Sequence, residues 1–309
     1  MIITPSAFSF LFRNVNTSHA MASAILEEHA TSDTDIIFFQ ELTQKHIRAA
    51  AHIDYIDSEP VIGLPSHPTW TCLPPPSKHS QVAIYIHQHI FKRYHFTVDK
   101  TIFGHPNIFA MFCYDDTTHV TYSYINIYAN PNRDCPAILK NTITTLLSQL
   151  HCISNLQVLQ GDFNLHCTYW DEASSDNPAL AWDLIRALHD KQMSLLNDES
   201  VPTFYRHGQR PQVLDLIWIN NAAFSWHDTE IIYDIKGPAV DHQTLTLCVG
   251  NNSSPSLTND HLLRCYIPSG SEEEEHFIFA IFEAVPTWTD PNPAERATQF
   301  ISSIKTAWD

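Results

Sequence analysis

Short apolar segments recur along the first 250 residues, and most of them end in polar residues. At 8–13 the rings of Phe8, Phe10 and Phe12 alternate with other side chains, a period of two that predicts a strand. Further strands are predicted at 36–39, 81–86, 108–114, 120–128, 156–159, 214–219, 230–235 and 244–249. Helices are predicted at about 16–28, 139–150 and 178–193, and the proline-rich segment 60–76 is predicted to be a loop.

The order of these elements constrains the fold class. Helices and strands interleave, yet several strands follow one another with no helix between them. This order favours a mixed sheet, or two packed sheets flanked by helices, over a doubly wound parallel α/β fold. A chain of 309 residues is long enough for one large domain with an appendage, or for two smaller domains.

The composition changes after Val249. Residues 251–256 are rich in Asn, Ser and Pro, as linkers are, and a helix is predicted to begin at the four glutamates 272–275. A last helix is predicted after Pro293. We therefore predict a domain at 1–250 and a linker with a helical extension at 251–309. The apolar stripes of the two helices have few local partners, so the helices either fold back on the domain or lead to another one.

Targeting signals and cysteine usage both favour an intracellular protein. No apolar run approaches the roughly 18 to 20 residues that cross a bilayer, so no membrane partner is expected. The N-terminus has neither the basic flank nor the apolar core of a secretory signal. The seven cysteines include no Cys-x-x-Cys pair, which fits thiols in a reducing compartment and argues against structural zinc.

Polar residues at the ends of the predicted strands are the candidate functional groups. They are Asn14, Asn16, Glu41, Tyr128, Asp162, Asn164, Asp215, Asp241 and His242. Most have an ordinary structural interpretation when taken singly: helix caps for the first two, a surface residue for Glu41, a ring at the core edge for Tyr128, a turn for Asp162 and Asn164, and a core histidine for His242. Asp215 is the exception, because it lies among apolar neighbours and a buried carboxylate needs a partner.

Together these groups supply the parts of metal-assisted phosphodiester hydrolysis. Glu41 is a hard oxygen ligand of the kind that Mg²⁺ takes. Asp215 beside His242 would orient the imidazole and favour its cation, a donor to the developing phosphorane. Asp162 would orient and deprotonate water, and the oxygens around it would be held by Asn164, Asn14 and Tyr128. The carboxylates of Glu41, Asp162, Asp215 and Asp241 would repel one another in one pocket, which favours a bound cation.

Six motifs in this order resemble those of the endonuclease/exonuclease/phosphatase family, over about residues 8–249. They are Arg13-Asn14-Val15-Asn16, Gln40-Glu41, Asn126-Ile127-Tyr128, Gly161-Asp162-Phe163-Asn164, Leu214-Asp215-Leu216-Ile217 and Asp241-His242. Residues 161–166 with Trp170, and residues 126–131, are most similar to the endonuclease domain of non-LTR (LINE-like) retrotransposons.

The resemblance implies a four-layer α/β sandwich and a divalent cation, usually Mg²⁺ with Mn²⁺ as the alternative. It implies DNA cleavage that leaves a 3′-hydroxyl to prime reverse transcription, which would place an active protein in the nucleus. It assigns Glu41 to the metal with Asn14 and Asp241 in support, Asp162 as general base or acid, Asn164 and Tyr128 as phosphate ligands, and Asp215 with His242 as a dyad. The C-terminal helices resemble the connector to a reverse transcriptase domain, which is one expected partner.

Two departures from the family pattern concern the surroundings of the site. Val240 precedes Asp241-His242 where the family commonly has serine, and Gln212-Val213-Leu214 stands where a small hydroxyl residue often precedes the buried aspartate. Both changes leave the reacting groups in place but weaken the support around them.

The net charge opposes a nucleic-acid substrate. With 17 Lys and Arg against 34 Asp and Glu, the formal net charge is −17, which repels polyanions unless cations gather on one face or a divalent metal intervenes. Two alternatives to a DNA endonuclease therefore stay open: an esterase acting on a phosphorylated small molecule or lipid head group, and an inactive, partner-binding remnant. A cluster of cations at the site would favour DNA; the candidates are Lys78, Lys92, Arg93, Arg133, Arg206 and Arg210.

Overall fold

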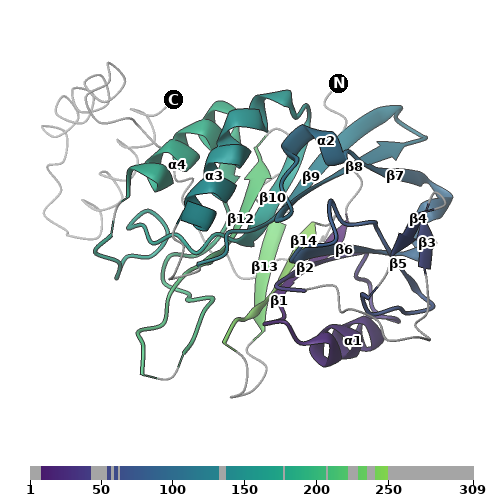
Figure 1. Ribbon diagram of the computed structural model, residues 1–309, viewed down its shortest axis with the longest axis horizontal. Helices are drawn as coiled ribbons and strands as arrows, with labels where there is room; N and C mark the ends of the chain where they lie inside the picture. The colour runs from purple at the N-terminus through teal and green to yellow at the C-terminus, as the bar shows by residue number, and fades with distance from the viewer. Residues whose placement is uncertain are drawn as a thin grey trace, which may run out of the picture. The chain divides into compact units, whose positions relative to one another are not determined.

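The computed structural model describes residues 8–42, 54–56, 59–61, 63–131, 137–176, 178–206, 208–221, 229–234 and 241–249. All of them belong to one compact unit within Met1–Leu262. Two six-stranded sheets form the centre of this unit, with helices on their outer sides (Figure 1). The predicted helices after residue 251 lie outside the described residues.

Both sheets are mixed. The first sheet has the order β13 (Thr229–Asp234), β14 (Thr244–Val249), β1 (Ser9–Asn14), β2 (Ile36–Gln40), β6 (Val82–His87) and β5 (Trp70–Cys72). The second has the order β11 (Met193–Leu195), β12 (Asp215–Asn220), β10 (Leu156–Asp162), β9 (Val120–Tyr128), β8 (Ile108–Asp115) and β7 (Tyr94–Val98). A separate short pair consists of β3 (Asp54–Ile56) and β4 (Glu59–Val61).

Each sheet contains one parallel pair, and a helix joins its two strands. The chain passes from β1 through α1 (His19–Glu28) to β2, and from β9 through α3 (Ala137–Gln149) to β10. Parallel strands need such a crossover, and it brings the carboxyl ends of both strands to the same edge. The other neighbours in the two sheets are antiparallel.

The period of two in β1 produces the layers. Phe10 and Phe12 face the second sheet, and the ring of Phe10 lies 5.5 Å from that of Tyr124 on β9. Leu11, between them in sequence, packs on the opposite face with Leu26 of α1. Because one face of each sheet buries the other sheet and the second face buries a helix, both faces are apolar.

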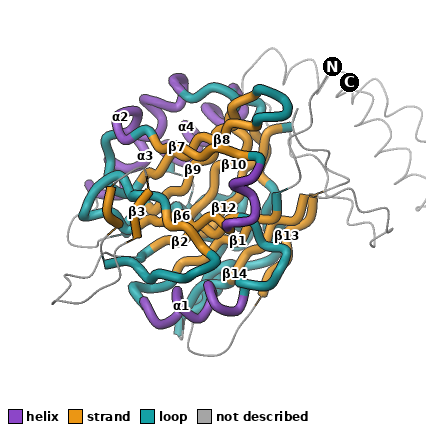
Figure 2. The backbone as a smooth tube through the Cα atoms, turned by 90° about the vertical axis from the view of Figure 1, so that its right-hand side faces the viewer, coloured by secondary structure: helices purple, strands orange, loops and turns teal. Residues whose placement is uncertain are grey.

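Helices close the sandwich on both sides (Figure 2). The Ser18 hydroxyl caps α1 by accepting from the Met21 amide at 3.2 Å. On the other side lie α2 (Lys100–Phe103), α3 and α4 (Ala179–Asp190), and α4 buries Leu184, Ile185 and Leu188. Two short 3₁₀ helices, η1 (Gln88–Lys92) and η2 (Leu150–Cys152), complete the described elements. None of the helices in the described residues is long and apolar enough to cross a bilayer.

The predicted strands occur where expected, but short edge strands were missed. The segment 60–76 is not all loop, because Trp70–Cys72 forms β5, and the helix predicted to reach 193 ends at Asp190, before β11. Three-residue strands are too short to show a period. Strand β7 was also missed, although its buried and exposed residues alternate from Tyr94 to Thr97.

Candidate active site

The ends of five strands from both sheets form one polar edge. In the first sheet Asn14 at the end of β1 pairs with Gln40 at the end of β2. In the second sheet Asp162 pairs with Tyr128 on one side and with Asp215, the first residue of β12, on the other. The predicted strand-end residues are therefore neighbours by register, before any side-chain contact is considered.

Asp162 is the buried centre of this edge. Its Oδ2 accepts a hydrogen bond from Asn14 Nδ2 at 2.9 Å, and its Oδ1 accepts from the Asn164 amide at 3.1 Å. The bond to Asn14 crosses from one sheet to the other. Burial and the charge of Asp215 raise the pKa of Asp162, and His242 and Asn14 only partly offset them.

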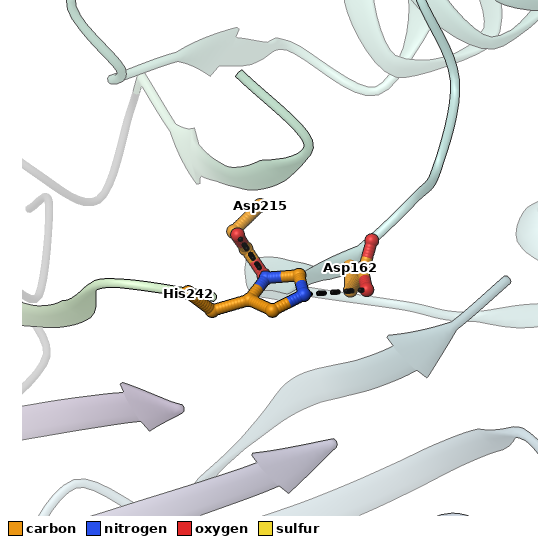
Figure 3. Close-up of side chains that lie close together, drawn as sticks. All are labelled: Asp162, Asp215 and His242. Atoms are coloured by element: carbon orange, nitrogen blue, oxygen red, sulfur yellow. Dashed lines mark hydrogen bonds and ion pairs between the residues drawn. The ribbon is translucent and has the colours of Figure 1, made fainter. Parts of the chain in front are cut away.

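His242 lies between two carboxylates (Figure 3). Its Nδ1 is 2.9 Å from Asp215 Oδ2, and its Nε2 is 3.9 Å from Asp162 Oδ2. Burial opposes the imidazolium, but the carboxylates of Asp215, Asp162 and Glu41 outweigh it and raise the pKa of His242 to about 9. The ring is also held edge-on by Phe204, at a centroid distance of 4.8 Å. The geometry therefore presents a cationic imidazole toward Asp162.

Glu41 and Tyr128 form a second pair at this edge. The Tyr128 hydroxyl donates to Glu41 Oε1, and burial followed by the Glu41 charge raises the pKa of Tyr128. Glu41 has φ +54°, a left-handed conformation that is uncommon for glutamate, and its carbonyl accepts from the Thr17 amide at 3.0 Å. The Glu41 charge also acts on both Asp162 and His242, so the four groups share one electrostatic environment.

Asn164 offers an unused donor. It also adopts a left-handed conformation, with φ +47°, which asparagine tolerates better than most residues. Its Nδ2 is buried and has no hydrogen-bond partner among the described residues. A buried N–H without an acceptor is costly, so this donor suits an oxygen of a bound ligand.

Asp241 and Asn16 do not join the cluster through their side chains. The Asp241 carboxylate is held by Arg206, whose Nη2 lies 2.8 Å from Oδ2, while the Asn16 backbone amide donates to Asn14 Oδ1 at 2.9 Å. The Arg206 guanidinium also lies 5.1 Å from the ring of Phe204, which packs on His242. Arg206 is thus a cation beside the site.

The other predicted cations make no described contact with the cluster. Arg93 pairs with Asp115 at the far end of β8, and Arg210 pairs with Asp171. Lys78 is exposed in the turn before β6, whose first residue pairs with Gln40, and Lys92 is exposed at the end of η1. Arg133 lies outside the described residues. Among the described residues, Arg206 is the one of these cations that contacts Asp241 and the ring of Phe204.

Comparison with known proteins supports the fold. A family model described as "Endonuclease-reverse transcriptase" matches residues 122–237. The endonuclease domain of TRAS1, a telomere-specific non-LTR retrotransposon, superposes with a TM-score of 0.55 at 15% identity, over 79% of this chain and 98% of that domain. The described sheets therefore have the fold of the endonuclease/exonuclease/phosphatase proteins, and residues 122–237 match one of their family models.

Two further solved structures share the fold at similarly low identity. AP endonuclease LMAP from Leishmania major has a TM-score of 0.59 at 12% identity, over 79% of this chain and 87% of its own. The 3′-5′ exonuclease NExo from Neisseria meningitidis has a TM-score of 0.50 at 15% identity, over 78% and 98%. No curated protein matches the chain by sequence. Since these structures carry different activities on one fold, the fold does not by itself fix the substrate.

Sequence analysis missed Thr203, which holds the start of β12. The small hydroxyl residue expected just before Asp215 is missing from the sequence, but the buried Thr203 hydroxyl accepts from the amides of Leu214 at 3.0 Å and Asp215 at 2.9 Å. The Gln243 amide in turn donates to the Thr203 carbonyl at 2.8 Å. A hydroxyl from another segment thus fixes the start of β12, which no sequence spacing reveals. The second departure, Val240, lies outside the described residues.

Replacing Thr203 by valine is expected to destabilise the protein by about 2 to 3 kcal/mol, because two buried amides lose their acceptor. Thr203→Ser retains the hydroxyl and is the matched control, expected to lose less than half as much. Chemical denaturation of the three proteins measures the difference. Equal losses in the two variants would show that the methyl group, not the hydroxyl, is what matters at Thr203.

The donor set at this polar edge suits a hard divalent cation. One ligand atom from each of Asp162, Asp215 and His242 lies within 4.8 Å of the others, and the Glu41 carboxylate is near enough to raise the pKa of both Asp162 and His242. Carboxylate oxygens are the ligands that Mg²⁺ and Mn²⁺ take. The pKa of Asp162 is raised by burial and by the charges of Asp215 and Glu41, so a cation here would stabilise its ionised form. The carboxylates at this edge therefore form a candidate divalent-metal site, and the imidazole of His242, already paired with Asp215, is not one of its proposed ligands.

Proposed function

We propose that the chain is a Mg²⁺-dependent phosphodiesterase, with Mn²⁺ able to replace Mg²⁺, and that its substrate is DNA. The observation that carries this proposal is the Asp215–His242 pair placed opposite Asp162. The side-chain Nδ2 of Asn164, which has no acceptor among the described residues, is the third group. A cationic donor, a carboxylate base and a neutral donor around one point are what attack of water on a phosphodiester requires. The match to an endonuclease-reverse transcriptase family and the fold shared with a retrotransposon endonuclease domain favour DNA.

In this mechanism the protein groups act from both sides of the phosphate. Asp162 orients a water molecule and takes its proton as the water oxygen attacks phosphorus. The His242 imidazolium, held by Asp215, donates to a phosphoryl oxygen as negative charge develops, and Asn164 Nδ2 donates to another. Tyr128 is a further phosphate contact. The P–O bond to the 3′ oxygen then breaks, and the leaving 3′ oxygen takes a proton from solvent, which gives a 3′-hydroxyl and a 5′-phosphate.

The cation would be held by Glu41 with Asn14 near it, and Asp241, whose carboxylate is paired with Arg206, would support the site from outside the cluster. When bound, Mg²⁺ would neutralise phosphate charge and stabilise the leaving oxygen. It would also offset part of the repulsion between DNA and a chain whose net charge is −17.

The test is incubation with supercoiled plasmid, with Mg²⁺ and with EDTA. We expect nicked circles only in the presence of the cation, and we expect the nicks to be extended directly by a DNA polymerase, which needs a 3′-hydroxyl. Nicks that need phosphatase treatment before extension would contradict the proposed bond cleavage. Intact plasmid together with hydrolysis of a small phosphodiester such as bis-p-nitrophenyl phosphate would favour a small-molecule or lipid head-group substrate. Inactivity on both would favour a catalytically inactive remnant.

The proposed origin is a non-LTR retrotransposon, and action on genomic DNA would take place in the nucleus. In this proposal residues 251–309 connect the endonuclease to a reverse transcriptase domain or bind another partner. The match of residues 122–237 to the endonuclease-reverse transcriptase family supports that proposal.

The rate should depend on pH through His242. Its imidazolium is the proposed donor, so the rate should fall as pH rises through about 9, where the ring loses its proton. Asp215 contributes most to raising this pKa, so Asp215→Asn lowers it and moves the alkaline limb of kcat/KM to lower pH. Asp183→Asn, on the exposed face of α4, is the control and should leave the limb in place. If the alkaline limb of Asp215→Asn lay at the same pH as that of the wild type, His242 would not be the proton donor that sets it.

A further inference from the structure

A small cluster of buried amides joins the two sheets below the site. Gln40 Nε2 on the first sheet donates to Asn126 Oδ1 at 2.7 Å and to Gln160 Oε1 at 3.1 Å on the second sheet. Gln160 Nε2 donates to the same Asn126 oxygen at 2.8 Å. We call these three residues, all at most 1% exposed, the seam amides.

Asn126 also ties the second sheet to two strands of the first. Its Nδ2 donates to the carbonyl of Phe39 at 3.0 Å and to that of Ala83 at 3.2 Å. Phe39 and Ala83 are partners in the antiparallel pair of β2 and β6. One side chain from β9 thus holds both strands, and elsewhere the two inner faces meet mainly through apolar side chains.

Each seam amide precedes one of the functional residues by one or two positions in the sequence. Asn126 is two residues before Tyr128, and Gln160 is two residues before Asp162, so each pair shares a face of its strand. Gln40 directly precedes Glu41. The cluster therefore connects the strand that delivers Glu41 to the strands that deliver Asp162 and Tyr128.

We propose that the seam amides are positioning residues, which set the distance and register between the Glu41 side and the Asp162 side of the metal site. This inference rests on the proposed function. Apolar contacts alone allow sheets to slide over one another at little cost, whereas directional bonds between buried polar groups allow few arrangements. Loss of a seam amide should then weaken cation binding in a protein that is still folded.

The test compares glutamine-to-methionine variants, which keep the length of the side chain but remove its amide. Gln40→Met and Gln160→Met alter the seam. Gln157→Met is the matched control, because Gln157 is equally buried on the same strand but bonds only to Asn155 at the far end of β10. Calorimetric Mn²⁺ affinity, thermal unfolding and plasmid nicking per folded molecule are measured for each.

We expect Mn²⁺ binding to weaken about 10- to 100-fold in Gln40→Met and in Gln160→Met, and the nicking rate at limiting metal to fall with it. Gln157→Met should lose stability but keep the wild-type affinity. The double variant Gln40→Met/Gln160→Met should bind like either single variant, because the seam acts as a unit. If Gln160→Met does not fold, Gln160→Asn, which shortens the reach of the amide, takes its place.

If both single variants bound Mn²⁺ with the wild-type affinity, or if the double variant lost the product of the two single losses, the positioning role would be wrong. The proposed function would not be affected by either result. A wild-type protein that binds no Mn²⁺ and cuts nothing would overturn the proposed function and this inference with it. The two failures are therefore distinguishable by the wild-type protein.

Discussion

Asp162→Asn is expected to lower the rate of Mg²⁺-dependent nicking by about 10²- to 10⁴-fold, the range that a positioned general base contributes. Asparagine has nearly the same shape and can still accept from Asn14, whose Nδ2 lies 2.9 Å from Asp162 Oδ2. It cannot take a proton from water. Single-turnover plasmid nicking at saturating Mg²⁺ measures the loss. Asp176 is exposed in the segment between β10 and α4. Asp176→Asn is therefore the control and should keep the wild-type rate.

The stability of Asp162→Asn separates lost chemistry from lost folding. The pKa of Asp162 is raised from its ordinary 3.8 to about 8 in the folded protein, so the native state binds more protons than the unfolded chain between these values. The contribution of Asp162 to the free energy of unfolding therefore falls as pH rises through that window. Asp162→Asn removes this contribution and should unfold at the same or a higher temperature than metal-free wild type at pH 8. A much lower melting temperature with a lost rate would indicate misfolding instead.

Gly161→Ala is expected to cost at least about 3 kcal/mol of stability, because the position has neither room nor a suitable backbone conformation for a side chain. An added Cβ would lie 1.9 Å from the Ile127 carbonyl oxygen, which is backbone and cannot move aside, and Gly161 has φ +147°. This close approach of β10 to β9 sits directly before Asp162. The variant should therefore also lose nicking activity in whatever fraction remains folded.

Gly208→Ala is the matched control for Gly161→Ala. Gly208 also has a positive φ, +77°, but an added Cβ would meet nothing within 4 Å. Only the backbone conformation is then penalised, at about 1 to 2 kcal/mol. Chemical denaturation compares the two variants, and an equal loss in both would show that the contact with Ile127 relaxes easily.

Side-chain periodicity was enough to predict most of the fold. In β1 the alternation of Phe10 and Phe12 with Leu11 directly reflects the two faces of a strand between a sheet and a helix. It failed for β5 and β11, because three residues contain too little periodicity, and because edge strands are selected by their neighbours rather than by their own pattern.

The site was predictable only where its residues follow strands. Asp162 ends a buried strand, Asp215 begins one and His242 precedes one, and the structure brings one ligand atom of each within 4.8 Å of the others. Thr203 was not predictable, because its role depends on one hydroxyl reaching two amides of a distant segment. The ion pair between Arg206 and Asp241 was not predictable for the same reason. Contacts made by turns depend on the closed fold and leave no periodic trace in sequence.

Cation binding by wild type and by Glu41→Gln tests the central claim most directly, namely that groups from both sheets hold one divalent ion. Isothermal titration with Mn²⁺ needs no substrate and no activity. The account predicts one site in the wild type and binding weakened at least about tenfold in Glu41→Gln. Glu27→Gln, an exposed residue of α1 paired with His67, should bind as the wild type does. No binding by the wild type, or equal affinity in Glu41→Gln, would contradict the account.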